Sequence, residues 1–360
     1  MAYEFPMIHA DAVIAHCRAG FEDECAADIE RIAAWAGVSL SIDAQHSRAF
    51  VTAAGRFDPN RWTAALAAVP PMFARSIFMG SGRHALSSRD RITPLVTHAA
   101  TLGPPYQSIW LETPDTNQGK MQSGMCRRLA PLLDSAMEAA GMLARGVAHL
   151  PRLHVLFEDD KNAWIGVSHA PTGSAWPMGI PRLAMPRGAP SRSTLKLAEA
   201  LMTFLDDDER LRWLRAAMRA VDLGAAPGGW TWQLAQRGLH VVAVDNGPLK
   251  GAVASDPLVE HLRADGLTYR PRRAVDWMVC DMVLQPSRIA ALVAAWVADG
   301  ACRRTIFNLK LPMKKRDAEV QRCAAVIRDT LRERRVKHVL RFRQLYHDRE
   351  EITGYCARIE

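Results

Sequence analysis

Hydrophobic and polar positions follow two different arrangements along the chain, one before and one after a stretch rich in proline and glycine. Residues 12–80 predict the order strand, helix, strand, strand, helix, strand, with apolar positions three and four apart in the helices. This order is typical of a ferredoxin-like α/β sandwich. Residues 88–170 then predict helices at 88–101 and 124–142, a strand between them, and a hairpin over 152–169.

The pattern changes after residues 171–190, which contain five prolines and three glycines. Proline removes an amide donor and fixes φ, so we expect no regular element to run through this stretch. Beyond it, short apolar strands alternate with helices, which predicts a doubly wound parallel sheet. Two last strands, 338–347 and 351–359, flank a short polar turn and predict an antiparallel hairpin that closes this sheet.

The chain is therefore expected to be an α/β protein of several domains. Residues 1–87 predict a ferredoxin-like subdomain and residues 88–170 a second α+β domain. Residues 171–190 are the expected linker, and residues 191–360 the expected Rossmann-like domain. A length of 360 residues agrees with two or three domains.

Composition favours an ordinary globular protein without a membrane span or a metal. Hydrophobic residues make up 49% of the chain, but the longest strongly apolar run, 289–298, is too short to cross a bilayer. The first residues lack a basic segment followed by an apolar core, so we expect no secretory signal and a cytoplasmic location. Seven scattered cysteines form no CxxC pair, which predicts free and mostly buried thiols. Twelve histidines form no cluster with ligand spacing, so no metal is implied.

Positive charge is concentrated near the end of the chain. Residues 303–349 contain fifteen Lys and Arg but five Asp and Glu, whereas the net charge of the whole chain is +8. A basic face of this kind favours a polyanionic partner, with a merely solvated basic surface as the alternative. On the helix expected over 318–335, the buried stripe is Val320, Ala324, Ile327 and Leu331, and the arginines largely avoid it.

A glycine-rich turn in VDLGAAPGGWTWQLAQRG (221–238) predicts a ligand site after a strand. A triphosphate loop needs GxxxxGK[ST], whereas no lysine follows Gly229. A dinucleotide-binding GxGxxG has its second glycine where this chain has Ala226, followed by Pro227. Close approach of a diphosphate is therefore disfavoured.

Acidic residues lie at or near the ends of the expected strands. Asp222 precedes the turn, Asp245 ends the next strand, Asp265 follows in a loop, and Asp281 ends a third strand. Open α/β sheets bind ligands in the crevice outside the carboxyl ends of their strands. Such an acidic crevice repels a diphosphate but suits an uncharged nucleoside joined to a sulfonium and an ammonium group. This combination points to S-adenosylmethionine, with S-adenosylhomocysteine as the product.

The segments LGAAPGGW and VDNG resemble the methyl-donor motif of ribose 2′-O-methyltransferases of the FtsJ/fibrillarin-like class. These enzymes carry a Lys-Asp-Lys-Glu tetrad, and SRSTLKLAEA, VCDMV, FNLKLPMKK and HDREEITGY match its four places. The resemblance assigns the tetrad to Lys196, Asp281, Lys310 and Glu351, the last preferred over Glu350. It also implies donor-binding roles for Ser193, Gly224, Ala226, Pro227, Gly228, Gly229, Trp230, Asp245, Asp265 and Asp281.

The resemblance also implies a division of labour within the tetrad. Lys310 is the base that takes the proton of the 2′-hydroxyl, and Lys196 and Glu351 position the ribose. Asp281 orients Lys310 and faces the methyl donor. A nearby cation lowers the pKa of a lysine and a nearby carboxylate raises it, so the protonation state of Lys310 stays open in the sequence.

Longer segments, including CRAGFEDECAADI, IFNLKLPMKKR and QLYHDREE, are more specifically similar to the ribosomal RNA large subunit methyltransferase M family, over nearly the whole chain. That family has a ferredoxin-like part and a THUMP domain, which binds structured RNA. It methylates a cytidine 2′-hydroxyl in the peptidyl-transferase loop of 23S rRNA. The resemblance implies 23S rRNA or an early large-subunit precursor as the partner, without a membrane, and we favour a monomer. One departure is Ala226, where the family has cysteine.

Two other functions stay open at this point. A THUMP-containing tRNA methyltransferase that modifies a base amine would carry [DN]PP[YF], whereas this chain has Met-Val-Leu after Asp281. A carbon-5 enzyme needs a nucleophilic cysteine, and Cys280 lies within an apolar strand. A non-catalytic RNA-binding factor in ribosome assembly would not need all four tetrad residues, which this chain retains.

Overall fold

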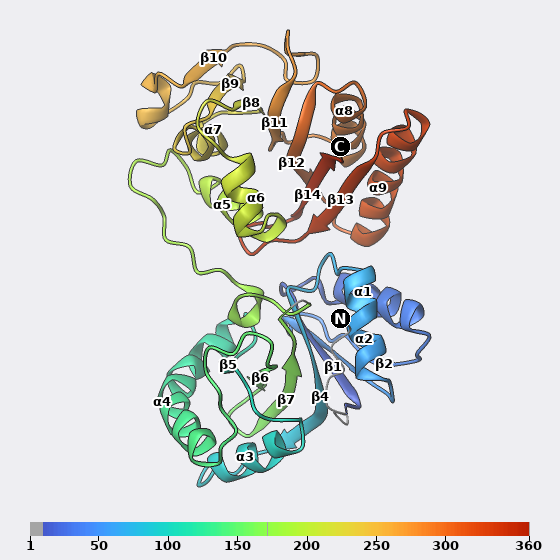
Figure 1. The fold of residues 1–360 in the computed structure, drawn as a ribbon, viewed down its shortest axis with the longest axis vertical. Helices are drawn as coiled ribbons and strands as arrows, with labels where there is room; N and C mark the ends of the chain where they lie inside the picture. The colour runs from blue at the N-terminus through green and yellow to red at the C-terminus, as the bar shows by residue number, and fades with distance from the viewer. Residues whose placement is uncertain (1–9, 171, 360) are drawn as a thin grey trace. The chain divides into compact units, whose positions relative to one another are not determined.

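The computed structural model describes residues 10–170 and 172–359, which form two units (Figure 1). The division falls between Pro181 and Arg182, inside the proline-rich stretch 171–190. Each unit is built on a seven-stranded sheet. The expectation about a secretory signal concerns the first residues of the chain, and residues 1–9 lie outside the described part.

The sheet of the first unit has the strand order β2-β3-β1-β4-β7-β6-β5. Its strands are β1 (Ala12–His16), β2 (Ser41–Asp43), β3 (Phe50–Ala54), β4 (Ser76–Ala85), β5 (Ser108–Glu112), β6 (Arg152–Phe157) and β7 (Asn162–Ser168). The helices are α1 (Glu22–Ala36), α2 (Pro59–Ala68), α3 (Ile92–Ala100) and α4 (Asn117–Ala139), and a 3-10 turn, η1, spans Pro177–Gly179. The order β1-α1-β2-β3-α2-β4 is the predicted ferredoxin-like order.

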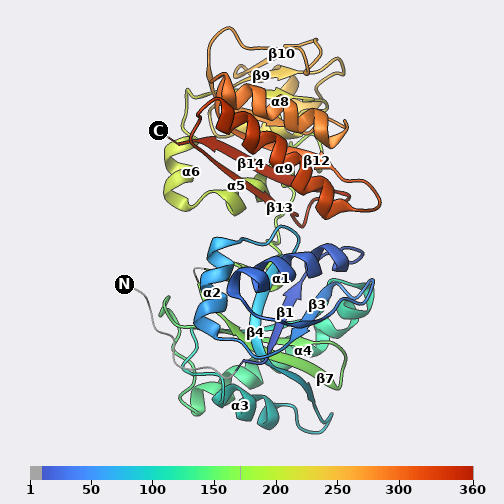
Figure 2. The same cartoon turned by 90° about the vertical axis from the view of Figure 1, so that its right-hand side faces the viewer.

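One feature of this sheet was not predicted. Strands β4 and β7 pair in antiparallel fashion, so a single sheet runs through both parts that the sequence divides at residues 87 and 88. Fully buried side chains of α1, α2 and α4, among them Ile29, Trp62 and Leu133, belong to one apolar core. The two N-terminal parts therefore share one sheet (Figure 2) and one apolar core.

The sheet of the second unit has the order β10-β9-β8-β11-β12-β14-β13. Its strands are β8 (Arg219–Leu223), β9 (His240–Val244), β10 (Val259–Leu262), β11 (Val275–Cys280), β12 (Cys302–Lys310), β13 (His338–Arg343) and β14 (Glu351–Arg358). The helices are α5 (Thr194–Phe204), α6 (Asp207–Trp213), α7 (Gly229–Ala235), α8 (Pro286–Ala298) and α9 (Arg316–Glu333), with a 3-10 turn, η2, at Gly251–Ser255. Strands β8 to β12 are parallel, and β13 and β14 form the predicted closing antiparallel hairpin.

Helices cover both faces of this sheet, as a doubly wound fold requires (Figures 1 and 2). Helices α5 and α7 pack on one face, where Leu201 and Leu234 join the core with Val279 of the sheet. Helices α8 and α9 lie on the other. The predicted stripe of α9 is buried from Val320 to Leu331.

The order of the strands creates a crevice. The chain runs outward from β8 through β9 to β10 and then returns to β11 on the other side of β8. At this switch point the connections leave the carboxyl ends of β8 and β11 in opposite directions, which opens a ligand site there. Within residues 10–170 and 172–359, no helix combines the length and apolarity needed to cross a membrane. All seven cysteines are free and buried, as predicted.

Candidate active site

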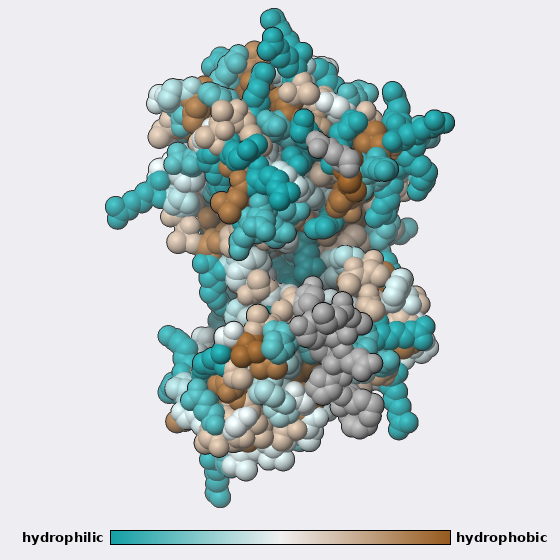
Figure 3. Space-filling model, viewed as in Figure 1, coloured by the Kyte–Doolittle hydropathy of each residue, from teal (hydrophilic) through white to brown (hydrophobic). Residues whose placement is uncertain are grey.

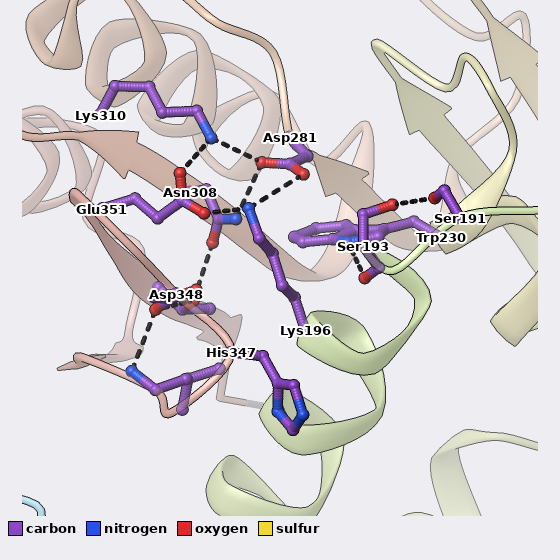
Figure 4. Close-up of polar contacts among 12 residues, drawn as sticks. Ser191, Ser193, Lys196, Trp230, Asp281, Asn308, Lys310, His347, Asp348 and Glu351 are labelled. Atoms are coloured by element: carbon purple, nitrogen blue, oxygen red, sulfur yellow. Dashed lines mark hydrogen bonds and ion pairs between the residues drawn. The ribbon is translucent and has the colours of Figure 1, made fainter. Parts of the chain in front are cut away.

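Four separate segments bring two lysines and two carboxylates together (Figure 4). Lys196 lies in the first turn of α5, and Asp281 directly follows β11. Lys310 ends β12 and faces Glu351, the first residue of β14, across the antiparallel pair. We call these four residues the tetrad.

Each lysine of the tetrad contacts both acids. Lys310 Nζ lies 3.1 Å from Asp281 Oδ1 and also donates to Glu351 Oε2. Lys196 Nζ lies 3.6 Å from Asp281 Oδ2 and also donates to Glu351 Oε1. The exposed fractions of the side chains run from 7% for Glu351 to 23% for Lys310, so the cluster is shielded but reachable. Charges of opposite sign alternate around it, which offsets much of the cost of partial burial.

The neighbouring acid, Glu350, does not share this position. Its side chain is 65% exposed, and its Oε2 lies 3.2 Å from Arg316 Nη2. Glu350 lies in the bend before β14, whereas Glu351 is the first residue of that strand and contacts both lysines. By geometry the acid of the tetrad is Glu351.

The position of Lys196 depends on contacts of α5 with other elements. Glu199, one turn further along the helix and 2% exposed, accepts hydrogen bonds from the N–H groups of Tyr346 and His347 at 2.8 and 2.9 Å. This carboxylate ties α5 to the turn that leads into Glu351. The positions of Lys196 on α5 and Glu351 on β14 are therefore fixed relative to each other.

The two acids control the protonation of Lys310. Burial disfavours its charge, but the effects of Asp281 and Glu351 outweigh burial and raise the pKa of Lys310 above its ordinary value. Burial opposes the charge of Glu351 too, yet the two lysines lower its pKa below its ordinary value. At pH 7, therefore, only a small fraction of Lys310 side chains in the protein without bound substrates is uncharged.

We expect the pH–rate profile to report this fraction. If neutral Lys310 is the base, the single-turnover rate of methyl transfer at saturating substrates should rise about tenfold per pH unit from pH 6 to pH 9. The reason is that the neutral fraction of a group grows tenfold per unit below its pKa. A plateau that begins near neutral pH would contradict a raised pKa at the reacting base.

A buried chain of hydrogen bonds, which was not predicted from the sequence, lies behind Asp281. Asn308 Nδ2 donates to Asp281 Oδ1 at 2.8 Å. The Thr353 hydroxyl lies 2.8 Å from Asn308 Oδ1 and 2.9 Å from Asp348 Oδ2. Thr353 has one hydroxyl proton, so it cannot donate to both neighbours. A protonated Asp348 would complete the chain by donating to Thr353, which would then donate to Asn308. Asp348 Oδ2 also accepts from the Leu345 N–H at 3.0 Å.

The spacing of residues along two strands could have predicted this chain of hydrogen bonds. Asn308 and Lys310 are two residues apart on β12, and Glu351 and Thr353 are two apart on β14. Residues two apart on a strand face the same side of the sheet. The register pairs Asn308 with Thr353, directly beside the pair formed by Lys310 and Glu351.

Replacing Asp348 should change how stability depends on pH. Burial raises the pKa of Asp348 well above its ordinary value. A carboxyl with a raised folded-state pKa contributes stability below its unfolded pKa, and this contribution is lost as the pH rises. Asp348→Asn has no such proton to keep, so its Tm relative to wild type should increase between pH 5 and pH 8. Thermal unfolding at both pH values measures this difference.

The matched control is Asp329→Asn, which changes an acid that is 58% exposed on α9. Its Tm difference from wild type should stay constant over the same range. If Asp348→Asn behaved in the same way as this control, Asp348 would be charged in the folded protein.

A cavity of about 370 Å³ lies at the carboxyl ends of β8, β9 and β11. Its lining includes Gly224, Ala226, Asp245, Asp265, Gly266 and Asp281. Five of these are residues for which the sequence predicted contact with a methyl donor. Asp281 belongs to both this cavity and the tetrad, so the two adjoin. We call this cavity of about 370 Å³ the donor cavity.

Glycine and an acid shape the turn beside this cavity. Gly224 has φ +78°, and a Cβ added there would lie 2.5 Å from Met282 Cγ, so a larger residue does not fit. Asp245 Oδ2 accepts from the Ala226 N–H at 2.9 Å, and Oδ1 accepts from the Gly247 N–H at 2.7 Å. Each oxygen keeps a further lone pair for a ligand.

Other residues predicted to bind the donor form the frame of the site. Trp230 is 2% exposed, and its Nε1 donates to the Ser193 carbonyl at 3.1 Å, which holds the start of α5 (Figure 4). Gly229 allows this close approach, because an added Cβ would lie 2.3 Å from Ser193 Oγ. The Pro227 carbonyl accepts from the Lys250 N–H at 2.9 Å, and Gly228 is the N-cap of α7.

Two further residues are buried: Asp222, which the sequence placed in the crevice, and Cys280, which lies in its apolar strand as predicted. Asp222, expected in the crevice, is 1% exposed and accepts from the Thr231 hydroxyl at 2.6 Å. It connects β8 to α7, and burial raises its pKa to about 7. Burial also raises the pKa of Cys280 to about 12, so this thiol is not an activated nucleophile.

A doubly wound sheet with an antiparallel closing hairpin, a cavity at its switch point and an adjoining Lys-Asp-Lys-Glu cluster together define a methyltransferase of the FtsJ-like class. The family model for FtsJ-like methyltransferases matches residues 189–309. Models for the RlmM ferredoxin-like domain and for the N-terminal region of ribosomal RNA large subunit methyltransferase M match residues 10–67 and 90–169.

Comparison with curated proteins identifies the particular family. The ribosomal RNA large subunit methyltransferase M of Aromatoleum aromaticum is 51% identical, over 97% of this chain and 95% of the relative. That of Methylococcus capsulatus is 49% identical, over 98% of this chain and 100% of the relative. The chain belongs to the ribosomal RNA large subunit methyltransferase M family. It is a methyltransferase, and its methyl donor is S-adenosylmethionine.

The donor cavity fits this cofactor chemically. Asp245 and Asp265 would offer carboxylate oxygens to ribose hydroxyls and to an amine, and Asp281 would add negative charge that favours a sulfonium. Gly224 and Gly266 keep the space open, since a Cβ at Gly266 would lie 2.9 Å from Met282 Sδ. Acids at the strand ends would instead repel the phosphates of a dinucleotide.

Proposed function

We propose that this protein transfers a methyl group from S-adenosylmethionine to the ribose 2′-hydroxyl of a cytidine in 23S rRNA, within the peptidyl-transferase loop. Membership of the family supports the substrate. One observation carries the reaction type: Lys310 Nζ lies 3.1 Å from Asp281, which also lines the donor cavity. A base is thereby held next to the place from which the methyl group comes.

When bound, the cofactor supplies an already activated methyl group. The protein must align the acceptor oxygen and remove its proton. Neutral Lys310 takes the proton of the 2′-hydroxyl, while Asp281 and Glu351 orient its Nζ. Lys196 and Glu351 position the ribose. Asn308 in turn orients Asp281 through the 2.8 Å hydrogen bond.

RNA affinity is proposed to come from the basic surface of α9 and the loop before it. Exposed cations there include Lys314, Lys315, Arg328, Arg334 and Arg335. The face of the second unit that Figure 3 draws is largely hydrophilic. Phosphate contacts of this kind supply affinity without sequence information. The choice of RNA then falls to the first unit, since proteins recognise RNA largely by its shape and its unpaired nucleotides.

We propose the domain roles accordingly. Residues 1–87 form the ferredoxin-like subdomain, 88–170 a THUMP-type RNA-binding domain, 171–190 the linker, and 191–360 the methyltransferase domain. The protein acts as a monomer in the cytoplasm, on 23S rRNA or an early large-subunit precursor.

Mapping of 2′-O-methyl groups on large-subunit rRNA, with and without this protein, tests the function. One cytidine in the peptidyl-transferase loop should lose its 2′-O-methyl group when the protein is absent. Nucleoside analysis that found base methylation instead would overturn the proposal. A purified protein that bound protein-free rRNA but never consumed the donor would indicate a non-catalytic assembly factor.

A further inference from the structure

A second cavity, of about 520 Å³, lies further along the same edge of the sheet. The donor cavity occupies the ends of β8, β9 and β11, whereas the second cavity lies between the end of β12 and the starts of α8 and α9. Leu284 lines both. Asp281 lines the donor cavity and Lys310 the second cavity, and their 3.1 Å contact joins the two.

This arrangement places the methyl donor and the acceptor nucleotide on opposite sides of the contact between Asp281 and Lys310. Displacement at a methyl carbon requires the attacking oxygen and the leaving sulfur on opposite sides of that carbon. A donor beside Asp281 therefore leaves the side of Lys310 for the acceptor. The acceptor nucleotide must bring its ribose to Lys310, which leaves its base to enter the second cavity.

The wall of the second cavity suits a nucleobase better than a phosphate. Leu284, Pro286 and Leu311 supply apolar contact surface. Glu319 and Arg322 lie one turn apart on α9, with Glu319 Oε2 2.5 Å from Arg322 Nη2. The lining also holds two cations, but Lys310 is paired with Asp281 and Glu351, and Arg322 with Glu319, so the wall offers little net attraction for a phosphate. The edge of a base offers both donors and acceptors to such a pair.

Two exposed apolar side chains strengthen this assignment. Val283 is 81% exposed and Met313 is 90% exposed. They belong to the loops that follow β11 and β12, two residues after Asp281 and three residues after Lys310. Apolar surface in these loops provides contact for a base that has left its stack.

We propose that the second cavity binds the base of the target nucleotide, and that Glu319 and Arg322 select cytosine over uracil. This rests on the proposed function, since it requires a ribose acceptor. Cytosine presents an amine at position 4 next to an acceptor nitrogen, so Glu319 accepts from the amine and Arg322 donates to the ring. Uracil presents a carbonyl at position 4, which would face the carboxylate.

The test uses two protein-free large-subunit rRNA transcripts that differ in one nucleotide, cytidine or uridine at the mapped site. Single-turnover methyl transfer with the wild-type protein should favour cytidine. Glu319→Ala should reduce the ratio of the cytidine rate to the uridine rate about tenfold or more. Glu319→Gln, which can donate to a carbonyl, should raise the relative rate on uridine. Glu333→Ala, an exposed acid on the same helix, should leave the ratio unchanged.

The outcomes separate this inference from the proposed function. Donor binding by calorimetry shows that each variant retains the folded site. If wild-type protein binds the donor but methylates neither transcript, the proposed function fails. If wild-type protein prefers cytidine and both Glu319 variants keep the wild-type ratio, the inference is overturned. A variant that slowed transfer to both transcripts equally would also overturn it, since Glu319 would then act without discriminating between the bases.

Discussion

Lys310→Ala should slow methyl transfer about 10²- to 10⁴-fold while leaving the affinity for S-adenosylmethionine nearly unchanged. Lys310 lines the second cavity, not the donor cavity, so its loss removes the base without removing donor contacts. A positioned general base typically contributes 10²- to 10⁴-fold to a rate. We expect a loss of about that size in the single-turnover rate, and a Kd for the donor within about threefold of wild type by calorimetry.

Two further variants separate the base from the charge. Lys310→Arg keeps a cation beside Asp281 and Glu351, but a guanidinium does not lose its proton near neutral pH, so transfer should be lost as well. Lys337→Ala removes an exposed lysine between α9 and β13 and should keep the single-turnover rate at saturating RNA. Retained activity in Lys310→Arg, or equal loss of rate and donor affinity in Lys310→Ala, would show that Lys310 does not act as the base.

The fold was predictable where a strand is buried on both faces and its sequence is therefore a continuous apolar run. Strands β8, β9, β11 and β12 lie in the middle of a parallel sheet, so their apolar runs identify them. The edge strand β10 was missed because Glu260 and His261 interrupt the apolar pattern. Helix α4 begins at Asn117 rather than near residue 124, because Thr116 caps it by accepting from the Gly119 N–H ahead of the apolar stripe. The pairing of β4 with β7 joins distant segments, and no local pattern predicts it.

The site was predictable to a different degree. Family resemblance identified the four residues that the structure brings together, since each lies in a distinctive local motif. The frame around them was not predictable in this way. Trp230 and Ser193, expected at the donor, contact each other. Asp348 lies within the segment HDREEITGY, but its burial depends on tertiary contacts that the segment does not reveal. The direction of the pKa shift of Lys310 depends on distances to two carboxylates, which a sequence does not contain.

Asp245→Ala should weaken donor binding more than it slows transfer. In the structure both oxygens of this carboxylate already accept backbone N–H groups, from Ala226 and Gly247, at 2.9 and 2.7 Å. The remaining lone pairs are the proposed acceptors for two ribose hydroxyls. Hydrogen bonds to a charged group contribute about 1.5–3 kcal/mol each, so losing two raises the Kd for the donor about a hundredfold or more.

The same substitution also releases the turn at Ala226, which shapes the donor cavity. The lost hydrogen bonds to the ribose and the released turn therefore both raise the Kd for the donor. At saturating donor the base and its partners are intact, and the single-turnover rate should recover to within about tenfold of wild type. Asp299→Ala, an exposed acid after α8, is the matched control and should leave the Kd unchanged. If Asp245→Ala kept full donor affinity but lost the rate at saturating donor, the acid after β9 would serve the reaction rather than the cofactor, and the assignment of the donor cavity would fail with it.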